Sequence, residues 1–168
     1  EFKTLLSGKA VLIIAPGSSS VEEKDKIIDF GSKDDVVTIS VNFDYKECRT
    51  DFIFLSNLRR FRKMKDGKER CIVTSNIPAD NVYLQTNYQN LLNDYEGVKD
   101  NAGMMLIKFL IDLGVKRIYL AGLDGYSVDP TRNFADEAMN FFTQKRIFET
   151  MNEGMNKALK EYSKSIKI

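Results

Sequence analysis

Residues 10–20 read AVLIIAPGSSS, and this stretch decides the fold class. The first six residues are continuously apolar instead of alternating with polar residues, which predicts a strand that is buried on both faces. A turn containing proline and glycine follows, and a helical pattern then runs over about 21–30. Ser20 and Glu23 have the spacing of a capping box at the start of this helix, and Gly31 is its expected stop. A strand, a turn and a helix in this order form the first half of a β-α-β unit.

The same alternation of strand and helix continues along the chain. Four further apolar runs predict strands over residues 36–41, 52–55, 71–74 and 115–121. A helix is expected over 102–113 with Gly114 as its stop, and 77–99 is expected to be a loop with one short helical turn. Alternating strands and helices imply right-handed crossovers. We therefore predict an α/β fold, a three-layer Rossmann-like domain with a mostly parallel sheet of about five or six strands.

A long amphipathic helix is expected near the C-terminal end of the chain. Its apolar positions recur at helical spacing and comprise Phe141, Phe148, Met151, Met155, Leu159 and Tyr162. Asn133 and Asp136 are the candidate caps at its start, whereas Gly154 should weaken the helix by about 1 kcal/mol relative to Ala. Such a helix usually packs on its own core, and the alternative is that Phe141, Phe148 and Met151 face a partner.

Length and composition indicate one ordinary globular domain that spans residues 1–168. The 25 basic and 24 acidic residues give a net charge of +1, which argues against an electrostatically driven nucleic-acid or membrane binder. No stretch approaches the ~20 consecutive apolar residues of a membrane span. Two cysteines are too few for a disulfide scaffold or a thiolate zinc site, so a reducing, cytoplasmic location is expected. The first residue is Glu1 instead of methionine, which suggests a piece excised from a longer protein.

The chain contains no histidine. This absence excludes Ser-His-Asp and Cys-His catalysis, histidine-ligated metal sites and a histidine general base within the chain. The sequence also contains no Asp-x-Asp pair, which would favour metal-assisted binding of a diphosphate. The glycine patterns of a Walker loop and of a dinucleotide-binding loop are missing too, which disfavours a nicotinamide-dependent oxidoreductase. We therefore expect neither a metal ion nor a cofactor.

Amides, hydroxyls and glycines follow the predicted strands at the points where they end. In open parallel sheets, ligands bind beyond these carboxyl ends, and such groups both donate and accept hydrogen bonds to bases, riboses and phosphate oxygens. A single Asn at such a point is explained as well by its preference for turns, but three on neighbouring strands favour a binding rim. The candidate ligand-binding residues from this pattern are Gly17, Ser18, Ser19, Asn42, Asn57, Asn76 and Gly122.

Two residues after the last predicted strand are candidates for chemistry. Asp124 lies on a glycine-flanked turn and is the candidate catalytic or ribose-binding carboxylate, with a turn residue that caps its own backbone as the alternative. Tyr126 is the candidate acid or orienting hydroxyl, with a half-buried core tyrosine as the alternative. Residues 59–70 (RRFRKMKDGKER) carry a local charge of +5, which fits either a contact with a phosphorylated or acidic ligand or a solvated helix. Only Phe61 interrupts this run as an aromatic, so it does not predict nucleic-acid binding.

Several segments, taken in order, resemble the bacterial sialyltransferase-like fold of glycosyltransferase family 42 and the related pterin-diphosphokinase-like domains. The matching segments are AVLIIAPGSSS at 10–20, VNF at 41–43, DFIFLSNLRRF at 51–61, CIVTSN at 71–76 and NAGMMLIKFLIDLGVKRIYLAGLDGYS at 101–127. The resemblance implies a metal-independent site for a nucleotide sugar, in the family CMP-activated sialic acid, at the carboxyl ends of the strands.

The resemblance also implies roles for individual residues. Gly17 and Ser19 of the first loop would face the nucleotide phosphate, and Asn42 and Asn57 would hold the base or the sugar. Residues 101–103, from Asn101 to Gly103, would lie along the phosphate and the ribose. Asp124 and Tyr126 would contact the cytidine.

The chain departs from the family pattern at several points. Pro16 stands where the family has a nucleotide-contacting Asn, and it has neither a backbone donor nor a side-chain amide. Asn101 and Ala102 replace a pair of small hydroxyl residues, and residues 127–133 are too few for the acceptor-covering lid. The general-base histidine of the family is missing. The resemblance therefore implies nucleotide-sugar binding more strongly than glycosyl transfer.

Similar domains also follow TIM-barrel aldolases of the hydroxymethylglutaryl-CoA lyase type. This likeness leads to a second hypothesis, in which the chain is a non-catalytic C-terminal accessory or dimerisation domain of such an enzyme. Its partners would then be a covalently linked aldolase barrel or a second copy of the chain, instead of a nucleotide or nucleotide-sugar ligand. No lyase motif lies in these residues, so lyase activity would belong to the barrel.

Overall fold

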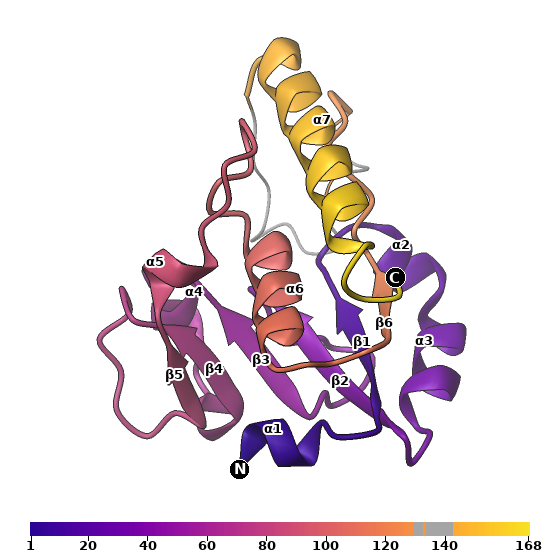
Figure 1. The fold of residues 1–168 in the computed structure, drawn as a ribbon, viewed down its shortest axis with the longest axis vertical. Helices are drawn as coiled ribbons and strands as arrows, with labels where there is room; N and C mark the ends of the chain where they lie inside the picture. The colour runs from indigo at the N-terminus through magenta and orange to yellow at the C-terminus, as the bar shows by residue number, and fades with distance from the viewer. Residues whose placement is uncertain (130–132, 134–142) are drawn as a thin grey trace.

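The computed structural model describes residues 1–129, 133 and 143–168. In these residues, six strands form one sheet in which every pair is parallel (Figure 1). The strands are β1 (Ala10–Ile14), β2 (Val36–Val41), β3 (Phe52–Leu55), β4 (Cys71–Thr74), β5 (Leu84–Thr86) and β6 (Ile118–Ala121). The helices are α1 (Phe2–Leu5), α2 (Ser19–Glu22), α3 (Lys24–Gly31), α4 (Leu58–Lys63), the 3-10 helix η1 (Lys68–Arg70), α5 (Tyr88–Leu91), α6 (Ala102–Asp112) and α7 (Lys145–Tyr162).

The strand β1, which lies between β2 and the edge strand β6, is buried on both faces, as its unbroken apolar sequence predicts. Val11 and Ile13 belong to the same core cluster as Met105 of α6, which crosses in front of the sheet in Figure 1. Leu12 and Ile14 pack with a separate cluster that contains Ile27 of α3. Helices therefore cover both faces of a parallel sheet, which confirms the predicted three-layer, Rossmann-like α/β class.

The strand order β5-β4-β3-β2-β1-β6 places a topological switch point beside β1. The chain adds β2 to β5 one after another on one side of β1, and it then returns to place β6 on the other side. Ile13 of β1 pairs with Ile39 of β2 on one side and with Leu120 of β6 on the other. In open parallel sheets, ligands bind in the crevice beyond the carboxyl ends at the point where the order reverses. The fold thus directs attention to the ends of β1 and β6.

The helix expected after β1 differs from its prediction. It is divided into α2 and α3, and the expected capping box is wrong because Ser20 is fully buried with no hydrogen-bond partner for its hydroxyl among the described residues. Gly31 is the last residue of α3, so the helix ends where the sequence predicts, with Ser32 as its C-cap. A side chain at residue 31 would meet the Thr38 methyl group at 2.9 Å, so this glycine serves helix-to-sheet packing.

The segment expected to be a loop at 77–99 contains β5 as well as the short helix α5. β5 has only three residues, and none of them is fully buried. Strand prediction depends on alternation over four or more residues, which a short edge strand of this kind cannot show. The last predicted strand is shorter than expected, since β6 begins at Ile118 instead of at residue 115.

The C-terminal helix α7 packs on its own domain. Phe148 is buried and Met151 is partly buried against the core, which confirms for these two residues that the helix packs on its own domain. Phe141 and Asp136 lie outside the described residues. Asn133 does not cap α7, because its amide bonds both backbone groups of Ser127 and the helix begins after Gln144. No helix in the described ranges has the length and apolarity that crossing a membrane requires.

Candidate functional site

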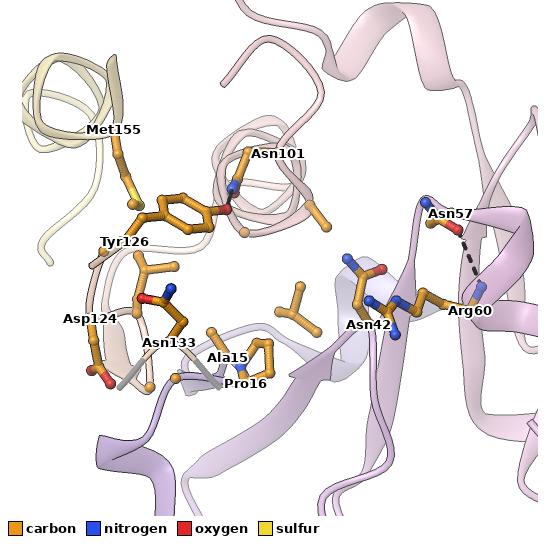
Figure 2. A pocket seen from close by; sticks show the side chains of 17 residues that line it. Ala15, Pro16, Asn42, Asn57, Arg60, Asn101, Asp124, Tyr126, Asn133 and Met155 are labelled. Carbon is orange, nitrogen blue, oxygen red and sulfur yellow. Dashed lines mark hydrogen bonds between the residues drawn. The ribbon is translucent and has the colours of Figure 1, made fainter. Parts of the chain in front are cut away.

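A cavity of about 230 Å³ opens at the carboxyl ends of the strands, beside the switch point (Figure 2). It is formed by the segments after β1, β2, β3 and β6 and by the first turn of α6. Among the residues predicted to bind a ligand or to act in catalysis, the cavity brings together Gly17, Asn42, Asn57, Asn101, Gly103, Gly122, Asp124 and Tyr126. Ser18, Ser19 and Asn76 do not line it.

The cavity has an apolar end and a polar end. Tyr126 and Met155 supply the apolar surface of one end, where Asn101, Asp124 and Asn133 also lie. Asn42, Asn57 and Arg60 lie at the other end, beyond β2 and β3. Figure 2 shows Tyr126 and Met155 well separated from Asn42 and Arg60. This arrangement suits a ligand with a ring at one end and hydrogen-bonding or charged groups at the other.

Asn42 is the most unusual residue of the cavity. It follows β2 directly, and its φ of 64° lies in the left-handed region that non-glycine residues rarely adopt. Its side-chain Oδ1 is buried and has no hydrogen-bond partner among the described residues. A buried acceptor without a partner costs about 1–3 kcal/mol, and a strained backbone adds a cost of similar size. Both costs fall on one cavity residue, which is typical of a functional site.

The other two predicted amides of the cavity also act as helix caps. Asn57 Oδ1 accepts a hydrogen bond from the backbone N–H of Arg60 at 3.2 Å, at the start of α4. Asn101 Oδ1 accepts one from Met104 N at 3.2 Å, at the start of α6. The preference of Asn for turns thus explains part of their presence. They nevertheless line the cavity.

Asn76 does not join the predicted rim. Its Nδ2 donates to the backbone oxygen of Ser56 at 3.0 Å, and its Oδ1 accepts from the Thr74 hydroxyl. β4 lies three strands away from β1 in the sheet, so the end of this strand is remote from the switch point. The prediction that three amides on neighbouring strands form one rim is therefore wrong for Asn76. Asn101, which precedes α6, lies in the cavity with Asn42 and Asn57.

The first loop uses its donors to bind the turn after β6. Gly17 N donates to Gly122 O at 2.8 Å, Ser19 N donates to Asp124 Oδ2 at 2.9 Å, and the Ser19 hydroxyl donates to Asp124 Oδ1. The Gly17 and Ser19 donors that the family resemblance directs at a nucleotide phosphate are therefore already bonded within the chain.

Asp124 holds the start of α2 through these bonds with Ser19. Its carboxylate accepts two hydrogen bonds beside the N-terminus of a helix, where a negative charge is favourable. Asp124 therefore caps a helix that is distant in sequence, and not its own turn as the alternative from the sequence had it. Asp124 is exposed at the edge of the cavity, so a contact with a ligand stays a prediction.

Replacement of Asp124 by Ala is expected to lower the free energy of unfolding by about 1–2 kcal/mol, because Ser19 loses both acceptors. Asp124→Asn keeps one acceptor oxygen and should lose less. Urea denaturation followed by circular dichroism measures both. Asp34→Ala removes the same charge from an exposed turn and is expected to change stability by less than about 0.5 kcal/mol. An equal effect of the Asp34 and Asp124 substitutions would contradict the capping role.

Tyr126 is fixed on every side at the apolar end. Its ring stacks on Phe148 with 5.6 Å between the centroids, and its hydroxyl accepts a hydrogen bond from Asn101 Nδ2 at 3.2 Å. Asn152 of α7 accepts from Tyr126 N at 2.7 Å and donates to Tyr126 O at 2.8 Å. Burial raises the pKa of the Tyr126 phenol, so it stays protonated at neutral pH and keeps a proton to donate.

Sequence reasoning did not assign Arg60 and Asn152 to the site. Arg60 was visible only as one of several basic residues in 59–70, and no local pattern distinguishes it from its neighbours. Asn152 lies on the amphipathic helix α7 and gives no signal, because its partner Tyr126 is on a distant turn. In the part of the chain that the structure describes, no three Cys, Asp or Glu side chains are grouped in a way that could hold a metal ion.

Comparison of the chain with protein-family models, with curated proteins and with solved structures gave no match in any of the three. The likeness to sialyltransferases and to lyase-associated domains therefore stays a prediction from the sequence.

Proposed function

We propose that this domain binds a nucleotide or a nucleotide sugar of the CMP-sugar type in the cavity beside the switch point. The location is the one at which open parallel sheets bind ligands. The volume of about 230 Å³ is below the ~300 Å³ at which pockets for drug-sized ligands begin. It therefore suits one unit of such a ligand, a nucleoside or a sugar, with the rest of the ligand at the open mouth.

The two ends of the cavity fit the two kinds of group in a nucleotide. Leu123, Tyr126 and Met155 offer apolar and aromatic surface against which a base can pack. Asn42 and Asn57 offer amides at the opposite end, which can bond hydroxyl groups of a sugar or ribose. A purely apolar ligand would leave these amides without partners, which is unfavourable.

The observation that carries the proposal is the buried Asn42 oxygen, which has no hydrogen-bond partner within residues 1–129, 133 and 143–168. An N–H or O–H group of a ligand would satisfy this buried acceptor, and it would offset a cost that the free protein otherwise bears. The left-handed backbone of Asn42 aims the amide at the end of β2, and glycine would adopt that backbone with less strain. An Asn at this position is therefore explained better by binding than by stability.

For chemistry on a bound nucleotide sugar, Tyr126 is the better placed of the two predicted catalytic residues. Its buried phenol keeps its proton and can donate a hydrogen bond to the ligand group that packs against it. The oxygens of Asp124 already accept two hydrogen bonds from Ser19. Binding is accordingly the proposed function, and a metal-independent transfer reaction is secondary to it.

Replacement of Asn42 by Gly tests the proposal. We expect binding of CMP and CMP-sugars to weaken about 10-fold, because one hydrogen bond to the ligand is lost. We expect the free energy of unfolding to rise by about 1 kcal/mol, since glycine relieves the backbone strain and removes the unpartnered oxygen. Isothermal titration calorimetry measures the first effect and urea denaturation the second.

Asn81→Gly is the matched control for this substitution. Asn81 is the other described non-glycine residue with positive φ, at 57°, and it is exposed and does not line the cavity. It should gain stability without any change in binding. Absence of heat and of thermal stabilisation when wild-type protein meets millimolar CMP, CDP and CMP-sugars would overturn the proposal, as would unchanged affinity in Asn42→Gly.

The second hypothesis, an accessory or dimerisation domain of an aldolase, depends on an apolar stripe that faces a partner. In the described part of α7, Phe148 is buried and Met151 is partly buried against the core of its own domain. The stripe therefore gives this hypothesis no support there. Size-exclusion chromatography with light scattering tests it, and a strictly monomeric chain would count against self-dimerisation.

A further inference from the structure

We infer that Tyr126 recognises a hydrogen-bond acceptor on the ligand, and that Asn101 is the positioning residue that turns the Tyr126 hydroxyl proton toward this acceptor. This inference rests on the proposed function and specifies what the ligand presents at the end of the cavity where Tyr126 lies. For a nucleotide, the acceptor is a carbonyl oxygen or an unprotonated ring nitrogen of the base.

The orientation of the Asn101 amide is fixed by the helix that it caps. Asn101 precedes α6, and its Oδ1 accepts a hydrogen bond from the backbone N–H of Met104 at 3.2 Å. A backbone N–H can only donate, so the amide atom that faces it must be the oxygen and not the nitrogen. The Nδ2 group with its two protons is therefore left to bond a different partner.

That partner of the Asn101 amide is the Tyr126 hydroxyl. Nδ2 lies 3.2 Å from the hydroxyl oxygen, and Figure 2 shows the two side chains meeting beside the cavity. An amide N–H₂ group only donates, so the hydroxyl oxygen is the acceptor of this bond. The proton of the hydroxyl cannot lie along the same line and points away from Asn101.

The Tyr126 proton is left for a ligand. The bond from Asn101 is the one that the hydroxyl makes within residues 1–129, 133 and 143–168, and Tyr126 lines the cavity. The side chain is held in place, because its ring stacks on Phe148 and Asn152 bonds both backbone groups of Tyr126. Burial raises the pKa of the phenol, so the proton stays on the oxygen at neutral pH. A largely buried donor without an acceptor is unfavourable, and a ligand acceptor would satisfy it.

These bonds form a chain that runs in one direction. The Met104 N–H donates to Asn101, Asn101 donates to Tyr126, and Tyr126 donates to the ligand. Successive bonds in such a chain polarise one another, which strengthens the last donor. Asn42 at the opposite end of the cavity has the reverse polarity, since its buried Oδ1 can only accept and has no partner in the described part of the chain. The cavity therefore selects a ligand with an acceptor at one end and an N–H or O–H group at the other, as in the base and the ribose of a nucleoside.

Asn101→Asp tests the inference in the otherwise unchanged chain, with CMP as the probe in isothermal titration calorimetry. Asp caps a helix as well as Asn does, so α6 keeps its cap, but a carboxylate has no proton to give to Tyr126. The phenol then donates to this carboxylate instead of to the ligand, and we expect the affinity for CMP to fall about 10-fold. Tyr126→Phe removes the same proton and should also weaken CMP binding about 10-fold.

The double variant separates this role from an effect of the added charge or of a displaced helix. In the Tyr126→Phe background, Asn101→Asp should weaken CMP binding by less than about threefold more, because the proton that the carboxylate captures is already missing. A charge effect or a displaced helix would instead act equally in both backgrounds and give a loss of about 100-fold in the double variant.

Asn87→Asp is the matched control, since Asn87 caps α5 through the same kind of bond but is exposed and outside the cavity lining. It should leave CMP binding unchanged, and thermal unfolding should show both cap variants folded and close to wild type in stability. Unchanged or tighter CMP binding by Asn101→Asp would overturn the inference, as would a loss of about 100-fold in the double variant. Those outcomes leave the proposed function intact, whereas a wild-type protein that does not bind CMP would end both.

Discussion

Gly122→Ala is expected to lower the free energy of unfolding by about 4 kcal/mol and to abolish ligand binding, the largest effect of any single substitution considered. The residue has a φ of 68°, and an added Cβ would lie 2.0 Å from the backbone oxygen of Ala15. Ala15 directly follows β1 and lines the cavity, so its oxygen cannot move without displacing the cavity wall. Urea denaturation and CMP titration measure the two losses.

Gly114→Ala is the control that separates backbone strain from the clash. Gly114 also has a positive φ, 83°, but an added Cβ would meet nothing within 4 Å. This variant should lose only the strain of a left-handed residue, about 1–2 kcal/mol, and should bind ligand normally. If the two alanine variants were equally stable, the close contact between Gly122 and Ala15 would not be the reason for glycine at this turn.

Gly154→Ala is expected to destabilise the protein by about 2–4 kcal/mol, although Ala is the better helix former by about 1 kcal/mol. Gly154 lies inside α7, and an added Cβ would come within 2.2 Å of the Glu96 backbone oxygen and 3.0 Å of Val98 Cγ2. The helix and the 96–98 loop approach so closely that either the loop or the whole helix must shift. Thermal and urea denaturation measure the loss.

The consequence of this shift should reach the cavity. α7 supplies Met155 to the cavity lining and Asn152 to the backbone of Tyr126, so a displaced helix is expected to weaken ligand binding as well. Asn156→Ala, at an exposed position of the same helix, should instead gain about 0.5 kcal/mol from helix propensity alone. A Gly154→Ala variant more stable than wild type would show that the loop yields easily.

Much of the fold could be predicted because its signals are local. The boundaries of β2, β3 and β4 coincide with their apolar runs, and α6 lies between Asn101 and Gly114 as its cap and stop residues indicate. The helix after β1 was harder, because Ser20 and Glu23 have the spacing of a capping box while Ser20 is buried under the sheet end. Tertiary burial overrides a local capping pattern when the side chain belongs to the core.

The candidate site was predictable only in part. A parallel sheet predicts that ligands bind beyond the strand ends. The residues predicted there that line one cavity include Asn42, Asn57, Asp124 and Tyr126. The sequence pattern could not show that Asp124 bonds Ser19, 105 positions away, or that Asn76 lies too far along the sheet to join the others. Both facts depend on strand order, which short-range periodicity does not encode.

The sequence by itself determined the class of fold, the positions of most strands and the absence of histidine chemistry, since these follow from residue type and from periodicity within about ten residues. Only the tertiary structure decided that β6 returns beside β1, and hence which strand ends share a cavity. It also decided that Gly154 faces a backbone oxygen, which reverses the effect expected of Ala there. The physical reason is the same in each case: close approach between distant segments is set by packing, and no local propensity records it.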